Sequence, residues 1–292
     1  MNRRYFVLSF AAAFMVMTVM AMIAVHFLSP DIDLDTSGPS QEADGYTPVD
    51  DDTLTVLMVG TSASGESAGA FVLLQFRPVE QRIWVTCLPP QTTLDSQARH
   101  TTLAGAYERG GGAYARLALS EAYQLGIDRY VVVDQSNFST IMELLGPVDF
   151  YLTNDIRFTN GEREIKLYAG IQRLDGTMIT DIVSFDDFPG GEVQRCETTS
   201  ELVIRVINDR LELAKSVVID ALFNSMINRV ETDITHNDYI ERRDALIYMA
   251  RLTVAPATAV YISGDFNESA EFVLSGESSN RLSSIFGVGE NS

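Results

Sequence analysis

Leu54-Thr-Val-Leu-Met-Val-Gly60 opens a series of apolar segments that decides the fold of this chain. Phe71-Val-Leu-Leu-Gln-Phe76 and Ile83-Trp-Val-Thr-Cys-Leu-Pro89 follow closely. Arg129-Tyr-Val-Val-Val-Asp134 comes next and leads to a segment that ends in Leu145-Gly-Pro-Val148. Three of these segments are continuously apolar rather than alternating. That pattern predicts strands buried on both faces, with helices packed above and below a sheet.

Helical patterns lie between and after these strands. Residues 112–125 stop before Gly126, and residues 138–145, with Ser136 as the expected N-cap, stop at Gly146. Further helices are expected at residues 192–213, 215–230 and 238–252, a strand pair at 149–153 and 164–167, and a last strand at 257–262. The second of these helices carries a stripe that is typical of a core face, made by Val217, Ala221, Phe223 and Ile227. The fold class that follows is α/β, a three-layer sandwich of a mixed sheet with helices on both faces.

The N-terminal segment predicts a membrane anchor. Residues 5–28 form an unbroken apolar run, and about 20 such residues in a helix cross the hydrocarbon core of a bilayer. Arg3 and Arg4 favour a cytoplasmic N-terminus. A cleaved signal peptide is the alternative, but its apolar region usually spans about 7–15 residues and ends at a small-x-small site. The flank at residues 25–29 fits such a site poorly, so we expect a single-pass membrane protein.

An acidic linker separates this anchor from the folded part. Residues 29–52 contain prolines and many acids, and like charges with little apolar content prevent collapse. The Ser- and Gly-containing end of the chain is expected to be peripheral. The expected organisation is therefore a cytoplasmic end at 1–4, an anchor at 5–28, a linker at 29–52, an extracytoplasmic domain at 53–270 and a peripheral tail at 271–292.

Charge and residue types exclude several classes of function. The chain has 40 acidic and 21 basic residues, a net charge of −19, so a nucleic-acid partner is not expected. Its 3 histidines and 2 cysteines form no zinc or thioredoxin motif, and no nucleotide-binding glycine loop is present. Asp186 and Asp187 could bind a divalent cation through oxygen atoms, although a solvated loop is the simpler interpretation.

The order of these segments resembles the LytR–CpsA–Psr family over residues 53–213. The resemblance rests on the strand ending at Gly60, the turn at Leu88-Pro89, and the leucine-glycine turn at Gly146. It also rests on two further segments, Leu125-Gly-Ile-Asp128 and Ala169-Gly170 through Leu174-Asp-Gly176. The resemblance implies an extracytoplasmic enzyme of a Gram-positive-type bacterium. Such an enzyme transfers a polyprenyl-pyrophosphate-linked glycopolymer to peptidoglycan with help from Mg²⁺, and holds the lipid in an apolar tunnel between sheet and helices.

The chain departs from this family where the family carries charge. Acids of the family align near Ser62 and with Gly69, and its Pro-Arg-Asp turn becomes Pro89-Pro90-Gln91. The Tyr-x-Arg segment falls at residues 181–184 and lacks arginine. A pyrophosphate needs cationic partners, usually arginine forks and a metal ion. Losing several charged groups that act together should leave little catalysis.

Few residues remain as candidates for a site. In the family's arginine-bearing helix only Arg195 is kept, with Glu192 as a stand-in for the acid, and these two are the catalytic candidates. The candidate ligand-binding residues are Arg195, Arg99, Arg109 and Gln91, with Arg116 as a further source of charge, although a surface role is simpler for the arginines outside the helix. The candidate metal ligands are Asp186 and Asp187, which would hold Mg²⁺ if the chain is active.

The resemblance also places the two cysteines in one pocket. Cys87 ends a strand, and Cys196 directly follows Arg195. A disulfide between them is conceivable outside the cell, and two buried, unpaired thiols are the alternative.

Three hypotheses of function follow. The first is a membrane-anchored pseudoenzyme that binds a polyprenyl-linked or wall glycopolymer, or a partner enzyme. The second is a divergent but active phosphotransferase that attaches lipid-pyrophosphate-linked glycopolymers to peptidoglycan. The third is an envelope scaffold or sensor that uses the fold only to bind another protein. A transcription factor is not expected, because the chain is acidic and has no recognisable DNA-reading element.

Overall fold

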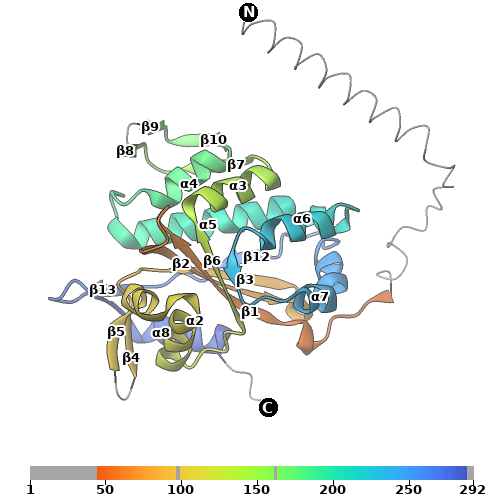
Figure 1. The fold of residues 1–292 in the computed structure, drawn as a ribbon, viewed down its shortest axis with the longest axis horizontal. Helices are drawn as coiled ribbons and strands as arrows, with labels where there is room; N and C mark the ends of the chain where they lie inside the picture. Colours follow the sequence, from red (N-terminus) through yellow and green to blue (C-terminus); the bar gives the residue numbers. More distant parts are fainter. Residues whose placement is uncertain (1–44, 97–98, 161–162, 288–292) are drawn as a thin grey trace, which may run out of the picture. The chain divides into compact units, whose positions relative to one another are not determined.

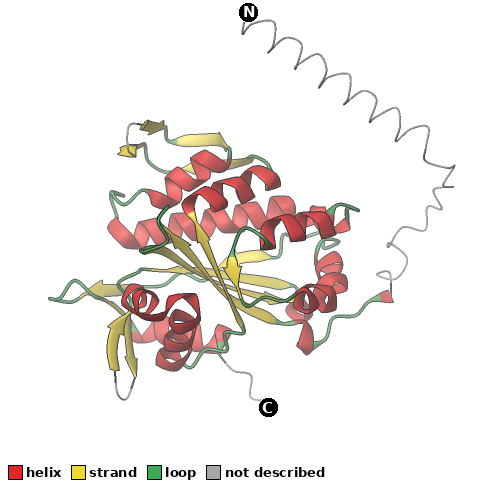
Figure 2. Cartoon of the chain, in the orientation of Figure 1, coloured by secondary structure: helices red, strands yellow, loops and turns green. Residues whose placement is uncertain are grey.

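A six-stranded mixed sheet forms the centre of the chain (Figures 1 and 2). The computed structural model describes residues 45–96, 99–160 and 163–287, with backbone only at Ser96, Arg99 and Asn160. The strand order is β11-β6-β1-β2-β3-β12. β1 is antiparallel to β2 and parallel to β6, and β3 is antiparallel to β2 and parallel to β12. These strands are β1 (Leu54–Thr61), β2 (Ala68–Arg77), β3 (Arg82–Leu88), β6 (Arg129–Asp134), β11 (Glu231–Thr232) and β12 (Ala257–Ala259).

Helices cover both faces of this sheet. On one face, Leu57 and Leu73 pack with residues of α2 (Leu103–Tyr123) and α8 (Gly276–Phe286). On the other face, Val72 and Val85 pack with residues of α5 (Gly191–Arg210) and α7 (His236–Met249). Neighbouring residues of β2 point to opposite faces, and both faces are buried, which explains why these strands are continuously apolar. The predicted mixed α/β sheet with helices on both faces is confirmed.

A kink divides α2 into two helical parts. Gly110 and Gly111 leave helical geometry, and Gly111 has φ +64° and ψ −161°, a conformation that is essentially open only to glycine. A Cβ atom on the next residue, Gly112, would lie 2.5 Å from the ring of Tyr130 in β6. The glycines therefore turn the chain and let the second part of α2 lie against the sheet. The sequence predicts only that second part, because the glycine run conceals the first.

A second layer of smaller elements lies beyond α5. It contains α3 (Gln135–Leu145), α4 (Gly176–Ser184) and two hairpin-like strand pairs, which share a core with Leu202 and Val206 of α5. The expected pairing of residues 149–153 with 164–167 is wrong. β7 (Val148–Leu152) pairs with β10 (Gly170–Leu174), and β8 (Ile156–Asn160) pairs with β9 (Arg163–Leu167). In short strands that are half polar, the pattern of polar and apolar residues does not indicate which strand is the hydrogen-bonding partner.

Local sequence signals also differ in detail from the structure. The N-cap of α3 is Asp134 rather than Ser136, because the Oδ1 atom of Asp134 accepts hydrogen bonds from the backbone N–H groups of Ser136 and Asn137. The predicted core stripe on α6 (Ile219–Ile227) is wrong: Val217 is 82% exposed and precedes the helix, and Ala221 is exposed. The ring of Phe223 instead stacks on Tyr239 of α7, with centroids 4.1 Å apart.

The remaining elements lie around this framework. The strands are β4 (Thr93–Ser96), β5 (Arg99–Thr102), β13 (Gly264–Phe266) and β14 (Phe272–Leu274), and the 3₁₀ turns are Asp50–Asp52, Pro78–Glu80 and Leu211–Lys215.

Both ends of the folded part differ from the sequence prediction. Residues 271–286 are not peripheral, since Phe272, Leu282 and Phe286 are fully buried in the core on the α2 face. At the other end, Asp52 is buried and accepts hydrogen bonds from the hydroxyl of Tyr46 and the backbone of Val49, so order begins before residue 53. The predicted anchor at residues 5–28 lies outside the described residues. Within them, no helix combines the length and apolar character that a bilayer crossing requires.

Candidate functional site

Four segments that the sequence marks as candidate site regions meet at one end of the sheet. They are the end of β1, the start of β2, the end of β3 and the first turns of α5. Arg195 of α5 donates from Nη2 to the carbonyl oxygen of Gly69 in β2 over 2.7 Å. The backbone N–H of Cys87, in β3, donates to the hydroxyl of Ser200 in α5 over 2.9 Å. The fold therefore brings Arg195, Glu192, Gly69 and both cysteines into one region.

Arg195 is enclosed by acceptors from the protein itself. Its Nε donates to Oε2 of Glu192 over 2.8 Å, and its Nη2 also pairs with Oε1 of Glu192. Its Nη1 donates to the carbonyl oxygen of Val183 over 3.2 Å, and the side chain is only 6% exposed. All three nitrogens of the guanidinium group are thus engaged, and its charge is compensated by a carboxylate one helical turn away. A phosphate could reach this arginine only by displacing these partners.

Electrostatics favour the charged form of Arg195. Burial opposes the positive charge of Arg195, but the hydrogen bonds and the charge of Glu192 outweigh it and raise the pKa of the guanidinium group. Asp181, in the segment where the family has a Tyr-x-Arg motif, is buried and pairs with Arg163 of β9. Burial raises the pKa of Asp181, while Arg163 acts in the opposite direction. Both carboxylates therefore serve as partners of protein arginines.

Cys87 and Cys196 lie next to each other and close to Arg195. Both are free and almost completely buried, at 1% and 2% exposure. The hydroxyl of Ser200 accepts from the Cys87 backbone and donates to the Cys196 carbonyl oxygen, each over 2.9 Å. The Cys196 thiol lies 3.8 Å from Oε1 of Glu192. A hydrogen bond with Cys87 and burial raise the pKa of the Cys196 thiol, which is therefore protonated.

The loop after β1 consists of small residues and one exposed acid, Glu66, and it carries no charge at the positions aligned with the family's acids. The backbone N–H of Ser62 donates to the Ser67 carbonyl oxygen over 2.9 Å, and the hydroxyl of Tyr107 in α2 donates to the Gly65 carbonyl oxygen over 3.1 Å. Gly69 is exposed, and a Cβ atom there would meet nothing within 4 Å. This backbone therefore has room for a side chain at position 69, but the chain supplies none.

The turn after β3 is closed by main-chain contacts rather than by charge. Pro89 and Pro90 are buried, and the Pro90 carbonyl oxygen accepts a hydrogen bond from the backbone of Ala104 over 2.8 Å. The side chain of Gln91 is exposed, and its carbonyl oxygen accepts from the backbone of Phe272 over 2.9 Å. Gln91 thus anchors β14 through its backbone. Within the part of the chain that the structure describes, no hydrogen bond joins its side chain to Arg195.

The other candidate arginines do not join the site. Arg109 is exposed just before the kink of α2 and has no hydrogen bond or ion pair with another described residue. Arg116 donates to the Ile127 carbonyl oxygen over 2.8 Å and ties α2 to the loop before β6. The side chain of Arg99 is outside what the structure describes. Of the three candidate arginines whose side chains the structure describes, only Arg195 lies where the resemblance expects positive charge.

Asp186 and Asp187 lie on the exposed loop between α4 and α5. The flanking Phe185 and Phe188 are buried and stack edge to face with centroids 4.8 Å apart, which leaves the aspartates facing solvent. Among the described residues, no group of three or more His, Cys, Asp or Glu side chains could hold a metal ion. The pair of aspartates alone would give a metal ion too few protein ligands.

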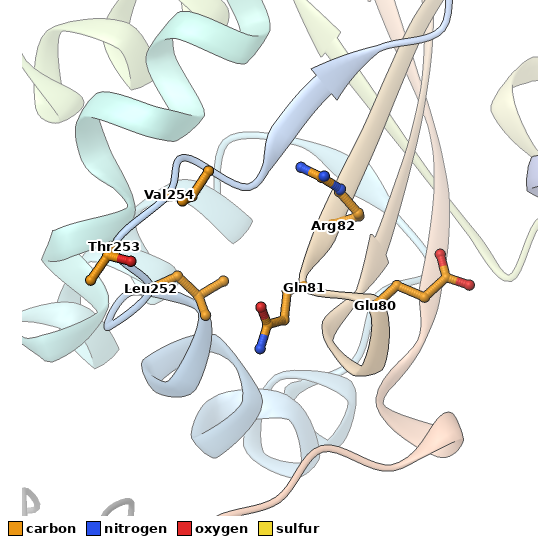
Figure 3. A pocket seen from close by; sticks show the side chains of 6 residues that line it. All are labelled: Glu80, Gln81, Arg82, Leu252, Thr253 and Val254. Carbon is orange, nitrogen blue, oxygen red and sulfur yellow. The ribbon is translucent and has the colours of Figure 1, made fainter.

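An open recess lies at the opposite end of β3 (Figure 3). Its volume is about 220 Å³, and it is lined by Glu80, Gln81, Arg82, Leu252, Thr253 and Val254. Gln81 donates from Nε2 to the Tyr248 hydroxyl over 2.7 Å. The recess starts where β3 begins, whereas Arg195 and the cysteines lie where β3 ends, so it is not part of the candidate site.

The space between the sheet and α2 with α8 is occupied by side chains. Phe71 from β2, Phe272 from β14 and Phe286 from α8 are all fully buried there. The resemblance implies an apolar lipid tunnel between sheet and helices, and this face of the sheet carries packed aromatic and leucine side chains instead.

The sequence does not reveal most of the groups that accept hydrogen bonds from Arg195. Glu192, three residues before it, is visible as a helical neighbour. The carbonyl oxygens of Gly69 and Val183 carry no signal in the sequence, because every residue has one. Arg163, the partner of Asp181, lies 18 residues away in a strand whose pairing was predicted incorrectly.

Comparison with known proteins bears on the fold and the family. The model of the LytR_cpsA_psr family matches residues 31–279. A structure from Eubacterium siraeum, described as a transcription regulator, gives a TM-score of 0.75 at 16% identity and covers 84% of this chain and 95% of its own. TagV from B. subtilis gives 0.65 at 18% identity, with 79% and 94% covered. TagU from B. subtilis gives 0.56 at 15% identity, with 80% and 94% covered. Curated protein sequences gave no match.

Proposed function

The chain belongs to the LytR–CpsA–Psr family, and we propose that it is a cell-envelope protein of this family that has lost phosphotransferase activity. The family relates it to cell-wall glycopolymer transferases. The proposal assigns it a binding role outside the cytoplasmic membrane, with residues 5–28 as the anchor. Its ligand would be a polyprenyl-linked or wall glycopolymer, or a partner enzyme.

The observation that carries this proposal is the state of Arg195. The one arginine kept in the family's arginine-bearing helix is buried and bound to Glu192, Gly69 and Val183. Transfer from a pyrophosphate requires positively charged donors that are available to stabilise the negative charge developing on the leaving oxygen. A guanidinium group held by a carboxylate and two carbonyl oxygens cannot provide it without losing those partners. Uncharged residues stand at most of the family's other charged positions, among them Ser62, Gly69, Pro90, Gln91 and Thr198.

A transfer assay tests the loss of activity. The full chain, in detergent or liposomes with Mg²⁺, is given several polyprenyl-pyrophosphate-linked glycans, with an active family member as the positive control. We expect no release of polyprenyl phosphate above the background without protein. Release that depends on Mg²⁺ and disappears in the Arg195→Ala and the Asp186→Asn, Asp187→Asn variants would overturn the proposal. It would support the active-transferase alternative.

The packed layer between the sheet and α2 favours a protein partner over a bound lipid. Fully buried aromatic side chains fill this layer, so a long polyprenyl chain would have to displace them. Extraction of the purified full chain with organic solvent, followed by mass spectrometry, separates the two ligands. We expect no co-purified polyprenyl lipid. A stoichiometric amount of such a lipid would reassign the binding role to lipid.

A further inference from the structure

We propose that Cys87 and Cys196 are a disulfide-forming pair, which in the extracytoplasmic compartment bridges the end of β3 to the first half of α5. The proposal rests on the proposed location of the domain outside the membrane, because disulfides persist in oxidising compartments. It assigns a covalent modification to the place where the family carries its charged site. Both side chains are buried among aliphatic neighbours, and the Cys196 thiol also lies 3.8 Å from Oε1 of Glu192.

The geometry brings the two residues together through one hydroxyl group. Ser200 accepts from the backbone N–H of Cys87 and donates to the carbonyl oxygen of Cys196, each over 2.9 Å. The two main chains are thus joined by two consecutive hydrogen bonds, and both side chains enter the same buried cluster between β3 and α5. A disulfide requires Cα atoms about 4.4–6.8 Å apart, and the hydrogen bonds through Ser200 hold the two main chains close together.

The burial and protonation of the thiols determine at which stage the disulfide can form. Both thiols are almost fully buried, and a hydrogen bond with Cys87 together with burial raises the pKa of the Cys196 thiol. A protonated, buried thiol is a poor nucleophile toward an external disulfide. Bridging therefore takes place while the chain folds, before the thiols are covered, or during local opening of α5.

The reaction is an exchange with a disulfide of the thiol–disulfide oxidoreductase class. One cysteine thiolate attacks the oxidoreductase disulfide and forms a mixed disulfide, releasing one oxidoreductase thiolate. The second cysteine thiolate then attacks the sulfur of its partner cysteine and displaces the other oxidoreductase thiolate. The two cysteines lose two protons and two electrons in total, and the oxidoreductase is left as a dithiol.

The bridge would act on the candidate site. Cys196 is adjacent to Arg195 in α5, so a covalent link to β3 fixes the helix turn that holds the ion pair with Glu192. The two cysteines are 109 positions apart in the sequence, and long loops lose the most unfolded-state freedom when closed. The oxidised protein should therefore be more stable than the reduced protein.

The first test uses the purified full chain. It is refolded in a buffer of oxidised and reduced glutathione, quenched with acid, alkylated under denaturing conditions and digested for mass spectrometry. We expect a Cys87–Cys196 peptide pair, no alkylation of either cysteine, and a Tm roughly 5–15 °C above that of the reduced chain. Cys87→Ala and Cys196→Ala are matched controls, because each keeps one thiol and cannot form the bond.

Two results would overturn the proposal, and they are distinguishable. If both cysteines stay free, or form only glutathione adducts or links between chains, the pair cannot bridge, and the proposed loss of transferase activity is unaffected. The second result is a bridge that forms in vitro, while thiol trapping in intact cells finds both cysteines reduced. In that case the proposed oxidising location of the domain is wrong. The transfer assay with the Cys87→Ala chain then still decides separately whether the protein is an enzyme.

Discussion

At the scale of single residues, the ion pair of Arg195 with Glu192 illustrates how burial changes the meaning of a charged side chain. The same arginine on an open surface would be a phosphate ligand. Here the side chain is almost enclosed, so its positive charge is needed to balance a carboxylate in a poorly solvated place. Its removal should therefore be felt as a loss of stability.

We expect Arg195→Ala to lower the free energy of unfolding of the full chain by about 2–4 kcal/mol, because Glu192 and two carbonyl oxygens lose their donor. Urea unfolding followed by fluorescence measures this change. Arg205→Ala is the matched control on the same helix, since its pair with Asp209 is exposed and should contribute less than about 1 kcal/mol. An Arg195→Ala chain of unchanged stability would contradict a structural role.

His100 shows a different electrostatic arrangement. Its Nδ1 lies 2.6 Å from Asp95, and its Nε2 lies 2.8 Å from Glu271, so the imidazolium group joins β5 to the loop before β14. The hydrogen bonds with Asp95 and Glu271 raise the pKa of His100. A hydrogen bond from Asn267 and the contact with His100 lower the pKa of Glu271.

The stabilisation from His100 should be confined to a window of pH. It is complete below the unfolded-state pKa of histidine, about 6.5, and is lost as pH rises through the higher folded-state value. The contribution of Glu271 is present above its unfolded-state pKa of about 4.5 and is lost as pH falls through the lower folded-state value. The Tm difference between wild type and His100→Ala should therefore be largest near about pH 5.5 and shrink toward about pH 9. A difference that grows with pH would contradict this arrangement.

At the scale of elements, α2 depends on a backbone conformation more than on its sequence propensity. Two glycines interrupt it, and the second helical part still packs on β6. The kink redirects the helix, and the missing Cβ atom of Gly112, directly after it, leaves room for the ring of Tyr130. The glycines are therefore structural requirements rather than traces of a phosphate-binding loop.

Gly111→Ala should destabilise the full chain by about 1–3 kcal/mol, because φ +64° with ψ −161° is strained for any residue that has a Cβ atom. Thermal unfolding by circular dichroism is a sufficient measurement. Gly276→Ala provides the comparison, since a Cβ atom at the start of α8 would meet open space, and its Tm should be unchanged or slightly higher. Equal effects of the two variants would show that the kink is not required.

At the scale of the whole molecule, the parts that could be predicted are those buried on both sides. The strand segments at residues 54–59, 71–76 and 130–133 are almost continuously apolar, because helices cover each face of the sheet. The first part of α2 was missed because glycines conceal its helical pattern. The tail was misjudged because Phe272, Leu282 and Phe286 are separated by serine, glycine and asparagine. At the site, the sequence indicates Arg195 as a candidate but does not reveal the carbonyl oxygens that hold it.

The last segment should be indispensable for the fold. A chain that ends at residue 270 lacks β14 and α8, and each buried phenylalanine that it loses contributes about 3–5 kcal/mol. We expect this truncated chain to show no cooperative thermal transition and to be digested rapidly by protease. The single variant Phe272→Ala should be intermediate, and Val273→Ala, whose side chain is exposed in the same strand, close to wild type. A protease-resistant, cooperatively unfolding truncated chain would contradict the prediction.

The burial of α8 also determines when the core can form during synthesis of the chain. Leu57 near the start of the folded part and Phe286 near its end belong to one core, so the α2 face of the sheet is incomplete until almost the entire chain is available. Contacts so distant in sequence form slowly. During synthesis, the first strands of the sheet therefore expose apolar surface until α8 has been made. A chaperone or an export channel that acts on unfolded chains would therefore have a long interval in which to engage this protein.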